Sequence, residues 1–447
     1  MLCRQTGLPL LLISIGSCCL PAQVPSGTAQ PVAQAPPPPV TILIKKTIVF
    51  LETDCLHDFE KDSASLTREA LLQMPPIQQQ NSVVRLSNLA LKLQSLKQKL
   101  KLQFVNDKSL TELSPQDVTR LMSNPNPNAT SEQNADQIEW RLRTLITLNK
   151  FTDEEIASLS DQDLTLIALD QYRGTGFLVG YPDSRIKRPP GESQPRLFPY
   201  LATNRHVIQP GIEHGAPCKI VRSFVLLNRK PDATHTSTYG ETDRIDQSLK
   251  WTTSPDDSVD LAVTGIGLDE SKYDHVLIPT SQFVSDDEVK NHKVVEGDPV
   301  LFAGLFVQTF NQLHTLEPIV RSGSLAMIPE ESLRMTLGNK PGHVYLAEVH
   351  AFGGNSGSPM FVDSTKFAAM IMVGTNLKLL GVISQEVFEN SDLTLTVATS
   401  MSGNITGNSG VSVVVPVSEL AKLLDDPSLK AARDHQIELQ QGSANPH

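Results

Sequence analysis

The chain has 447 residues, of which 39% are hydrophobic and 19% charged, and its net charge is −11. This length can support two or three domains, and the apolar content is enough for a sizeable core. The basic residues form no block and are outnumbered by acidic ones, so we do not expect nucleic acid as the main partner, because phosphate binding needs clustered lysine and arginine.

The first 23 residues predict a targeting signal. Arg4 gives a positive start, and the apolar stretch 8–15 is too short to span a bilayer as a mature helix. Cleavage after Ala22 would release a secreted protein. Alternatively, Ile-Gly-Ser-Cys at residues 15–18 is similar to a bacterial lipobox, which would leave a lipidated Cys18 as a membrane tether. Both interpretations stay open, and both predict a protein outside the cytoplasm, whether periplasmic, secreted or at the cell surface.

Residues 24–40 are rich in proline, alanine and glutamine, which predicts an extended linker. Beyond the leader the chain has only two cysteines, Cys55 and Cys218. They can form a disulfide in an oxidising compartment, or they can be two buried thiols, and sequence alone does not show that they meet. No Cys/His cluster has the spacing of a zinc site, so we expect no metal and no cofactor.

A strand is predicted over residues 41–51, and residues 55–170 then have helical character. Leucines at steps of three and four residues give one apolar face to a long helix, with lysines among its polar positions: Leu86, Leu89, Leu93, Leu96 and Leu100, and Lys92, Lys97, Lys99 and Lys101. Helix caps are predicted at Ser114, Thr152 and Ser160. This helical region can bind a partner protein or a second copy of itself, or it can be a packing insertion, since apolar stripes usually face a core.

From Tyr172 onward, short apolar runs alternate with turn residues, which predicts an all-β sandwich or barrel. A last helix is predicted from Pro416 to about Leu424, and the tail over residues 426–447 is predicted to be disordered. The predicted strands include residues 176–179, 201–203, 224–227, 261–263, 300–303, 360–362, 379–383 and 411–415.

Ser356 lies among glycines in the turn 352–360, where the backbone can turn tightly and approach a substrate. A serine is a weak nucleophile unless a base and an orienting acid assist it. His206 follows a strand, and Asp260 directly precedes an apolar run, so both side chains can point from strand ends into a cleft. These three residues predict a catalytic triad.

The order His206, Asp260, Ser356 is the order of the chymotrypsin-type triad. Together with the surrounding motifs, it makes the chain resemble the trypsin-like serine peptidases, closest to the bacterial secreted and periplasmic heat-shock proteases. Five segments carry the resemblance, in this order: Gly-Thr-Gly-Phe-Leu-Val (174–179), Thr-Asn-Arg-His-Val (203–207), Asp-Leu-Ala-Val (260–263), Gly-Asn-Ser-Gly-Ser-Pro (354–359) and Leu-Gly-Val-Ile-Ser (380–384).

The resemblance implies a mainly β fold, a chymotrypsin-like double β-barrel, with a large α-helical insertion after the first strand. The peptidase domain would comprise residues 41–54 and 171–425, with 55–170 as the insertion. Many relatives have a PDZ domain after the peptidase domain, and we expect none after residue 425.

The resemblance also implies a role for each residue. Ser356 would be the nucleophile, His206 the general base and later acid, and Asp260 the carboxylate that fixes the imidazole tautomer. The backbone N–H groups of Gly354 and Ser356 would form the oxyanion hole, and Ser384 would begin the strand that pairs with substrate. The expected activity is hydrolysis of polypeptides by a serine endopeptidase through an acyl-enzyme.

Three positions depart from the family pattern. Ser358 replaces a glycine, Glu386 replaces a glycine on the wall of the specificity pocket, and His350 falls at the base of that pocket. His350 would suit an acidic substrate side chain and Glu386 a basic one, so the sequence predicts no substrate specificity.

The sequence also bears on two other functions. The chain could be a binding or scaffold protein on a protease fold that has lost its activity, acting through the helical insertion. An esterase of the α/β-hydrolase type is disfavoured, because it needs Gly-x-Ser-x-Gly and the order Ser, Asp, His.

Overall fold

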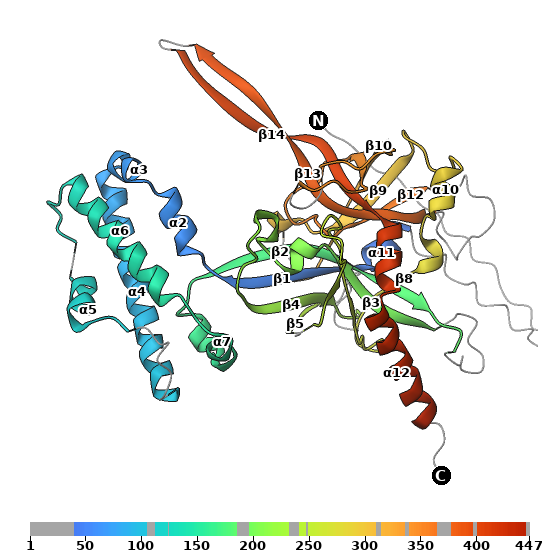
Figure 1. Ribbon diagram of the computed structural model, residues 1–447, viewed down its shortest axis with the longest axis horizontal. Coiled ribbons are helices and arrows are strands. Elements are labelled where there is room, and N and C mark those ends of the chain that lie inside the picture. Colours follow the sequence, from blue (N-terminus) through green and yellow to red (C-terminus); the bar gives the residue numbers. More distant parts are fainter. Residues whose placement is uncertain are drawn as a thin grey trace, which may run out of the picture. The chain divides into compact units, whose positions relative to one another are not determined.

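The computed structural model describes most of the chain beyond residue 39 (Figure 1). The predicted leader, with Cys18, and all of the predicted linker except Val40 lie outside the described residues. The described residues are 40–104, 112–123, 125–185, 196–231, 241–246, 249–309, 314–335, 339–363, 377–396 and 400–443.

An eight-stranded sheet comes first along the chain. Its hydrogen-bonded order is β5-β4-β1-β2-β3-β7-β6, with β8 pairing in parallel with β2 at one side. The strands are β1 (Ile48–Leu56), β2 (Leu169–Pro182), β3 (Leu197–Thr203), β4 (Ile220–Asn228), β5 (Thr242–Asp246), β6 (Thr252–Thr253), β7 (Ala262–Gly265) and β8 (Ile278–Pro279).

Among the described residues this sheet is open, so the structure shows one closed barrel and one open sheet where a double β-barrel was predicted. It is nevertheless strongly curled. The two edge strands, β5 and β6, are six strand spacings apart, about 29 Å in a flat sheet. The chain runs from Asp246 to Thr252 in six residue steps, which span at most about 20 Å. The edge strands β5 and β6 must therefore curve towards each other, although no hydrogen-bonded ladder joins them among the described residues.

The second sheet does close into a barrel, in the order β10-β11-β14-β13-β12-β9. Its pairs are all antiparallel, and the β13–β14 ladder continues to the pair Thr396–Ser400 as a two-stranded ribbon (Figure 1). The strands are β9 (Pro299–Gly304), β10 (Ile319–Met327), β11 (Tyr345–Glu348), β12 (Pro359–Asp363), β13 (Leu377–Thr396) and β14 (Ser400–Pro416).

One apolar core is shared by the two sheets. Ile48 and Phe177 enter it from the first sheet, and Phe302 and Met360 enter it from the barrel, each 6% exposed or less. In β1 and β2 of the first sheet, alternate residues point into this core and the residues between them point into a second cluster on the other face, as expected for the pleat of a sheet. The loops at the ends of these strands are therefore held on a rigid frame.

A helical region follows β1, as predicted, and has a hydrophobic core of its own. The predicted caps at Ser114, Thr152 and Ser160 are confirmed, each accepting a hydrogen bond from a backbone N–H three residues on. The helices are α2 (Phe59–Ser65), α3 (Arg68–Gln73), α4 (Pro76–Gln103), α5 (Pro115–Met122), α6 (Ser131–Leu148), α7 (Asp153–Ser158) and α8 (Asp161–Leu164).

The leucine stripe of α4 faces this core, but one of its predicted polar positions does not face solvent. Lys97 is 1% exposed. Its ammonium group lies 3.4 Å from the Glu155 carboxylate and 3.8 Å from the centre of the Phe151 ring. A buried lysine needs such a partner, because an unpaired charge is costly away from water.

The beginning of the first predicted strand is a helix instead. Residues Val40–Lys45 form α1, and the strand starts only at Ile48. Ile44 is 4% exposed in the shared core. Tertiary packing of this face overrides the β-preference of the isoleucines, which is a weak tendency.

The C-terminal end differs from its prediction. The helix α11 (Val417–Leu424) is confirmed, but the stretch predicted to be disordered forms a further helix, α12 (Pro427–Ser443). Leu429, Arg433 and Ile437 are spaced by four residues and are 7%, 3% and 5% exposed, so one face of α12 is buried. The remaining helical segments are α9 (Arg205–Ile208), α10 (Asp286–Lys290), η1 (Ile212–His214), η2 (Thr280–Gln282) and η3 (Val307–Thr309).

Among the described residues, no helix is both long enough and apolar enough to cross a membrane.

Arg433 should be the main anchor of α12. Its guanidinium donates to the Tyr200 hydroxyl (2.8 Å) and the Leu424 carbonyl (2.9 Å) and lies 4.0 Å from the Tyr181 ring centre. We expect Arg433→Ala to lower the free energy of unfolding by about 2–4 kcal/mol, because hydrogen bonds to a charged group are lost in a buried site. Urea denaturation measures this, with exposed Lys430→Ala as the control; equal midpoints for the two variants would contradict the assignment.

Candidate active site

Two of the three predicted triad residues, His206 and Ser356, line one cavity of about 370 Å³. His206 lies on α9, just after β3, and Asp260 lies just before β7, so both come from the first sheet. Ser356 lies in the turn before β12, and Ser384 on β13, so both come from the barrel. His206, Ser356 and Ser384 line the cavity, and Asp260 is buried behind them at 1% exposure.

Asp260 is held by hydrogen bonds from several sides. Its Oδ2 lies 2.7 Å from His206 Nδ1 and accepts from Ser384 Oγ at 2.5 Å. Its Oδ1 accepts from the backbone N–H of His206 at 3.1 Å. This arrangement presents the other ring nitrogen of His206, Nε2, away from the carboxylate.

The pKa values of this pair move in opposite directions. Burial alone would raise the pKa of Asp260, but the charge and hydrogen bonds of His206 and the Ser384 hydroxyl outweigh it and lower the pKa. Burial alone would lower the pKa of His206, but the Asp260 charge and hydrogen bond, with the Glu213 charge, raise it above 6.5. Asp260 is therefore ionised at neutral pH, and it stabilises a proton on His206.

The motif around His206 has a physical role at each position. Thr203 donates to the Thr175 carbonyl at 2.7 Å, and Asn204 donates to the Asp260 carbonyl at 2.8 Å. Val207 packs where a Cβ on Gly174 would lie 2.6 Å from it, so only glycine fits at that position of β2. The segments 174–179 and 203–207 fit against each other, and this packing requires the residue types that make both motifs recognisable in the sequence.

The turn that carries Ser356 depends on two glycines in the left-handed region, Gly354 (φ 97°) and Gly357 (φ 87°). A Cβ on Gly357 would collide with the carbonyl oxygen of Thr175. Thr175 also accepts from Leu305 N (2.9 Å) and donates to the Gly354 carbonyl (2.7 Å), so it fixes the turn from β2. The role of Thr175 could not be predicted from sequence, because its partners lie far along the chain.

Most N–H groups of this turn are already bonded. Those of Phe352, Asn355, Gly357 and Ser358 donate within the turn or to the Ile383 carbonyl. Among the described residues, the N–H groups of Gly354 and Ser356 have no hydrogen-bond partner. They are thus available to an oxygen placed in the cavity.

The Ser356 hydroxyl donates to the carbonyl of Ser384 at 3.1 Å, and no hydrogen bond joins it to His206 within the described part of the chain. Such bonds are often long or misaligned in the absence of substrate and tighten when it binds.

Of the two residues expected in the specificity pocket, only one lines the cavity. Glu386 lines the cavity with Ser356. His350 is exposed and does not line it; its ring lies beside Gly410 on β14.

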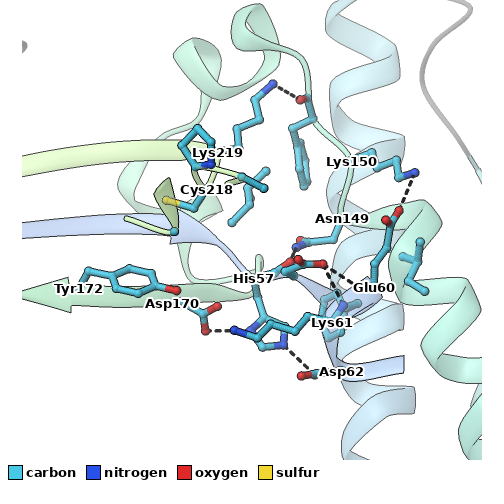
Figure 2. A pocket seen from close by; sticks show the side chains of 18 residues that line it. His57, Glu60, Lys61, Asp62, Asn149, Lys150, Asp170, Tyr172, Cys218 and Lys219 are labelled. Carbon is cyan, nitrogen blue, oxygen red and sulfur yellow. Dashed lines mark hydrogen bonds and ion pairs between the residues drawn. The ribbon is translucent and has the colours of Figure 1, made fainter. Parts of the chain in front are cut away.

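A second, larger cavity of about 800 Å³ lies where the helical region meets the first sheet (Figure 2). His57 lies at this junction, with Nδ1 2.8 Å from Asp170 on β2 and Nε2 2.8 Å from Asp62 on α2. Its ring meets Phe59 edge-on at 4.6 Å between centroids. This cluster could not be predicted from sequence, because Asp170 is more than a hundred residues away from His57.

Cys218 lines the same cavity and forms a disulfide with Cys55, which decides between the two alternatives left open by the sequence. The bond joins the end of β1 to the segment before β4, across 163 residues of chain. No group of three or more His, Cys, Asp or Glu side chains is arranged to hold a metal within the described ranges.

No family model matches this chain, and no curated protein matches it. A solved structure that is similar is the crystal structure of AL20, a thermostable serine protease from an extremophilic microorganism. Sequence identity is 10%, the TM-score is 0.26, and the match covers 55% of this chain and 85% of that one.

His57 should make stability depend on pH. Burial alone would lower its pKa, but its hydrogen bonds and ion pairs with Asp62 and Asp170 raise the pKa above 6.5. A raised folded-state pKa gives stability that is complete below about 6.5 and is lost as pH rises through the folded-state value. We therefore expect the stability difference between wild type and His57→Gln to be larger at pH 5.5 than at pH 9.

Urea denaturation across this range measures that difference. His435→Gln, at an exposed position of α12, is the control for replacing a histidine away from this junction. A His57→Gln difference that is the same at both ends of the range would contradict a charged His57 at the junction.

Proposed function

We propose that this chain is a serine endopeptidase that uses His206, Asp260 and Ser356. The observation that carries the proposal is the buried Asp260 carboxylate, 2.7 Å from His206 Nδ1, with Ser356 in the same cavity as that histidine. A buried carboxylate that fixes one imidazole nitrogen leaves the other to act as a base. The free N–H groups of Gly354 and Ser356 add a place for the oxyanion.

The chemistry follows from these positions. Ser356 Oγ attacks the peptide carbonyl carbon while His206 Nε2 takes the hydroxyl proton, and Asp260 stabilises the resulting imidazolium. The N–H groups of Gly354 and Ser356 donate to the negative oxygen of the tetrahedral intermediate. The C–N bond breaks as His206 returns the proton to the leaving amine, which leaves an acyl-enzyme. Water, deprotonated by His206, then releases the acid and restores Ser356.

Before attack, Ser356 must exchange its bond to the Ser384 carbonyl for one to His206. A serine χ1 rotation between staggered positions is a small change. Ser384 then has two contributions: its hydroxyl holds Asp260, and its carbonyl holds the resting nucleophile.

We further propose an extracytoplasmic location, supported by the Cys55–Cys218 disulfide, since such bonds persist in oxidising compartments. The peptidase domain would be residues 41–54 and 171–425, extended by α12, whose Arg433 contacts Tyr200 on β3. Residues 55–170 remain a proposed module for self-association or for a partner protein. For the leader we keep both proposals, a lipidated Cys18 and cleavage after Ala22.

A second candidate is a binding protein that has lost catalytic activity on this fold. The hydrogen bond from Ser356 to Ser384, in place of one to His206, favours it. The discriminating observation is reaction of Ser356 with an acylating reagent without turnover of any peptide.

Ser356 should react with a fluorophosphonate probe, and the wild type should cleave unfolded casein. The probe needs an activated serine and an oxyanion site, which Ser356 would have. Ser356→Ala should do neither, and Ser358→Ala, at the buried serine of the same turn, tests whether labelling is specific. Failure of the wild type to label and to cleave would refute the peptidase proposal.

Asp260→Asn should lower kcat by about 10⁴-fold, because the amide favours the wrong imidazole tautomer. In the wild type, kcat/KM should rise with pH and level off above 6.5, since the pKa of His206 is raised. In Asp260→Asn the remaining activity should level off at lower pH, because the countercharge is gone. Asp257→Asn, an exposed carboxylate 59% open to solvent, should keep the wild-type profile; an equal loss in both variants would contradict the assignment.

A further inference from the structure

The long helix α4 has a second stripe, on the side opposite to the leucines that face the helical core. Its apolar members recur every two or three turns: Ile77, Val84, Leu91 and Leu102. Ile77, Val84 and Leu102 are 65%, 42% and 80% exposed, and Leu91 is half-buried. These residues, together with those between them on the same face, are called the outer stripe of α4.

The remaining members of the outer stripe are uncharged polar residues: Asn81, Asn88, Ser95 and Gln98, all exposed. Apolar and polar members follow each other along the helix at alternating steps of four and three residues, so they share one face. The stripe is about 38 Å long, since each helical residue adds about 1.5 Å. This pattern is typical of a helix that packs lengthwise against another helix, where an amide at a core position fixes the register.

One border of the outer stripe has an excess of positive charge. The helix α4 contains basic residues but no acidic residue. Lys97, Lys99 and Lys101 form ion pairs with carboxylates elsewhere in the helical region. Arg85 and Lys92, two turns apart beside the stripe, are exposed and have no ion pair among the described residues. Their charges are therefore available to a partner.

The other border also has unpaired cations. Arg141 of α6 is 1% exposed, and its Nε donates to the Oγ of Ser87, which lies about 200° round α4 from Arg85. The guanidinium groups of Arg120 and Arg141 lie 4.0 and 5.5 Å from the centre of the Trp140 ring. Neither has an ion pair within the described part of the chain. Burial and the charge of Arg120 lower the pKa of Arg141 to about 10, as expected where no anion compensates the charge.

These charges decide which partner the surface fits. Two copies of α4 packed on each other would bring two sets of bordering cations together and supply no carboxylate, and like charges across an interface are unfavourable. A membrane surface would need a face of large apolar side chains, whereas half of the outer stripe is amide or hydroxyl. An amphipathic helix with acidic borders complements both the apolar positions and the cations.

We propose that the outer stripe of α4 binds an amphipathic helix of another protein, whose apolar face is bordered by aspartate or glutamate. Its apolar side chains pack on the stripe, and its carboxylates form ion pairs with Arg85 and Lys92 on one border and with Arg120 on the other. Asn81 and Asn88 hydrogen-bond to polar groups of the bound helix and set its register. This binding goes beyond the proposed peptidase activity and does not depend on it.

The experiment measures fluorescence anisotropy of labelled helical peptides with the full chain carrying Ser356→Ala, so that no peptide is cleaved. One peptide has leucine at heptad positions a and d and glutamate at e and g, and a matched peptide has lysine at e and g. We expect the glutamate peptide to bind and the lysine peptide not to bind. Arg85→Glu combined with Lys92→Glu should weaken binding of the glutamate peptide about 5–30-fold, the size of two exposed ion pairs, and should allow the lysine peptide to bind.

A matched control changes the net charge equally at other exposed positions, Arg143→Glu on α6 combined with Lys430→Glu on α12, and should leave binding unchanged. Ile77→Gln combined with Val84→Gln should weaken the glutamate peptide without a change of charge. Urea midpoints equal to that of the parent chain establish that the variants fold. Absence of binding to the glutamate peptide, or equal losses in the two charge variants, overturns the proposal.

Two further outcomes would assign the stripe to another occupant and also overturn the proposal. The first is a dimer of the full chain in sedimentation velocity that Ile77→Gln with Val84→Gln abolishes, which would make a second copy the occupant. The second is binding to phosphatidylglycerol vesicles, lost in Arg85→Glu with Lys92→Glu, without binding of the glutamate peptide. None of these measurements uses hydrolysis, so their failure leaves the peptidase proposal standing, and the reverse also holds.

Discussion

The buried carboxylate of Asp260 is the constraint around which the candidate site is built. At 1% exposure, an ionised carboxylate is tolerable only if its oxygens are fully bonded, and here they bind the ring and backbone of His206 and the Ser384 hydroxyl. Ser384 belongs to the barrel, whereas His206 and Asp260 belong to the first sheet. One carboxylate thus ties the two halves of the shared core together at the point where Ser356 enters the cavity.

Much of this site could be predicted from sequence because its motifs contain residues that close packing requires. Gly174 leaves room for Val207, and Gly357 leaves room for the Thr175 carbonyl, so short patterns specify the contacts of the His206 and Ser356 segments. Helix caps were predictable for the same reason, since each is a contact between residues three apart. That Glu386 lines the cavity while His350 does not could not be predicted, because it depends on which strand ends meet around the cavity.

The errors share a physical cause, which is a partner distant in the chain. Lys97 has the sequence context of a surface residue, and its burial is tolerable because Glu155, the Lys150 carbonyl and the Phe151 ring lie around its ammonium group. Arg433 lies in a polar stretch that predicts disorder, yet Tyr200 and the Leu424 carbonyl hold it. Whether the first sheet closes depends on pairing between its edge strands β5 and β6, and no β5–β6 ladder joins them among the described residues.

The helical region can be accommodated because it leaves and re-enters the sheet at one place. Leu56 and Leu169, the ends of β1 and β2, are paired, so the ladder is not broken by what lies between them. The Cys55–Cys218 disulfide fixes that end to the loop that follows α9, closed on itself by the Cys218 N–H bond to the Pro210 carbonyl (2.7 Å). This loop forms part of both cavities, since Cys218 lines the junction and Glu213 lines the site of Ser356. A displacement at the junction must therefore deform the loop or move Glu213, whose charge contributes to the raised pKa of His206.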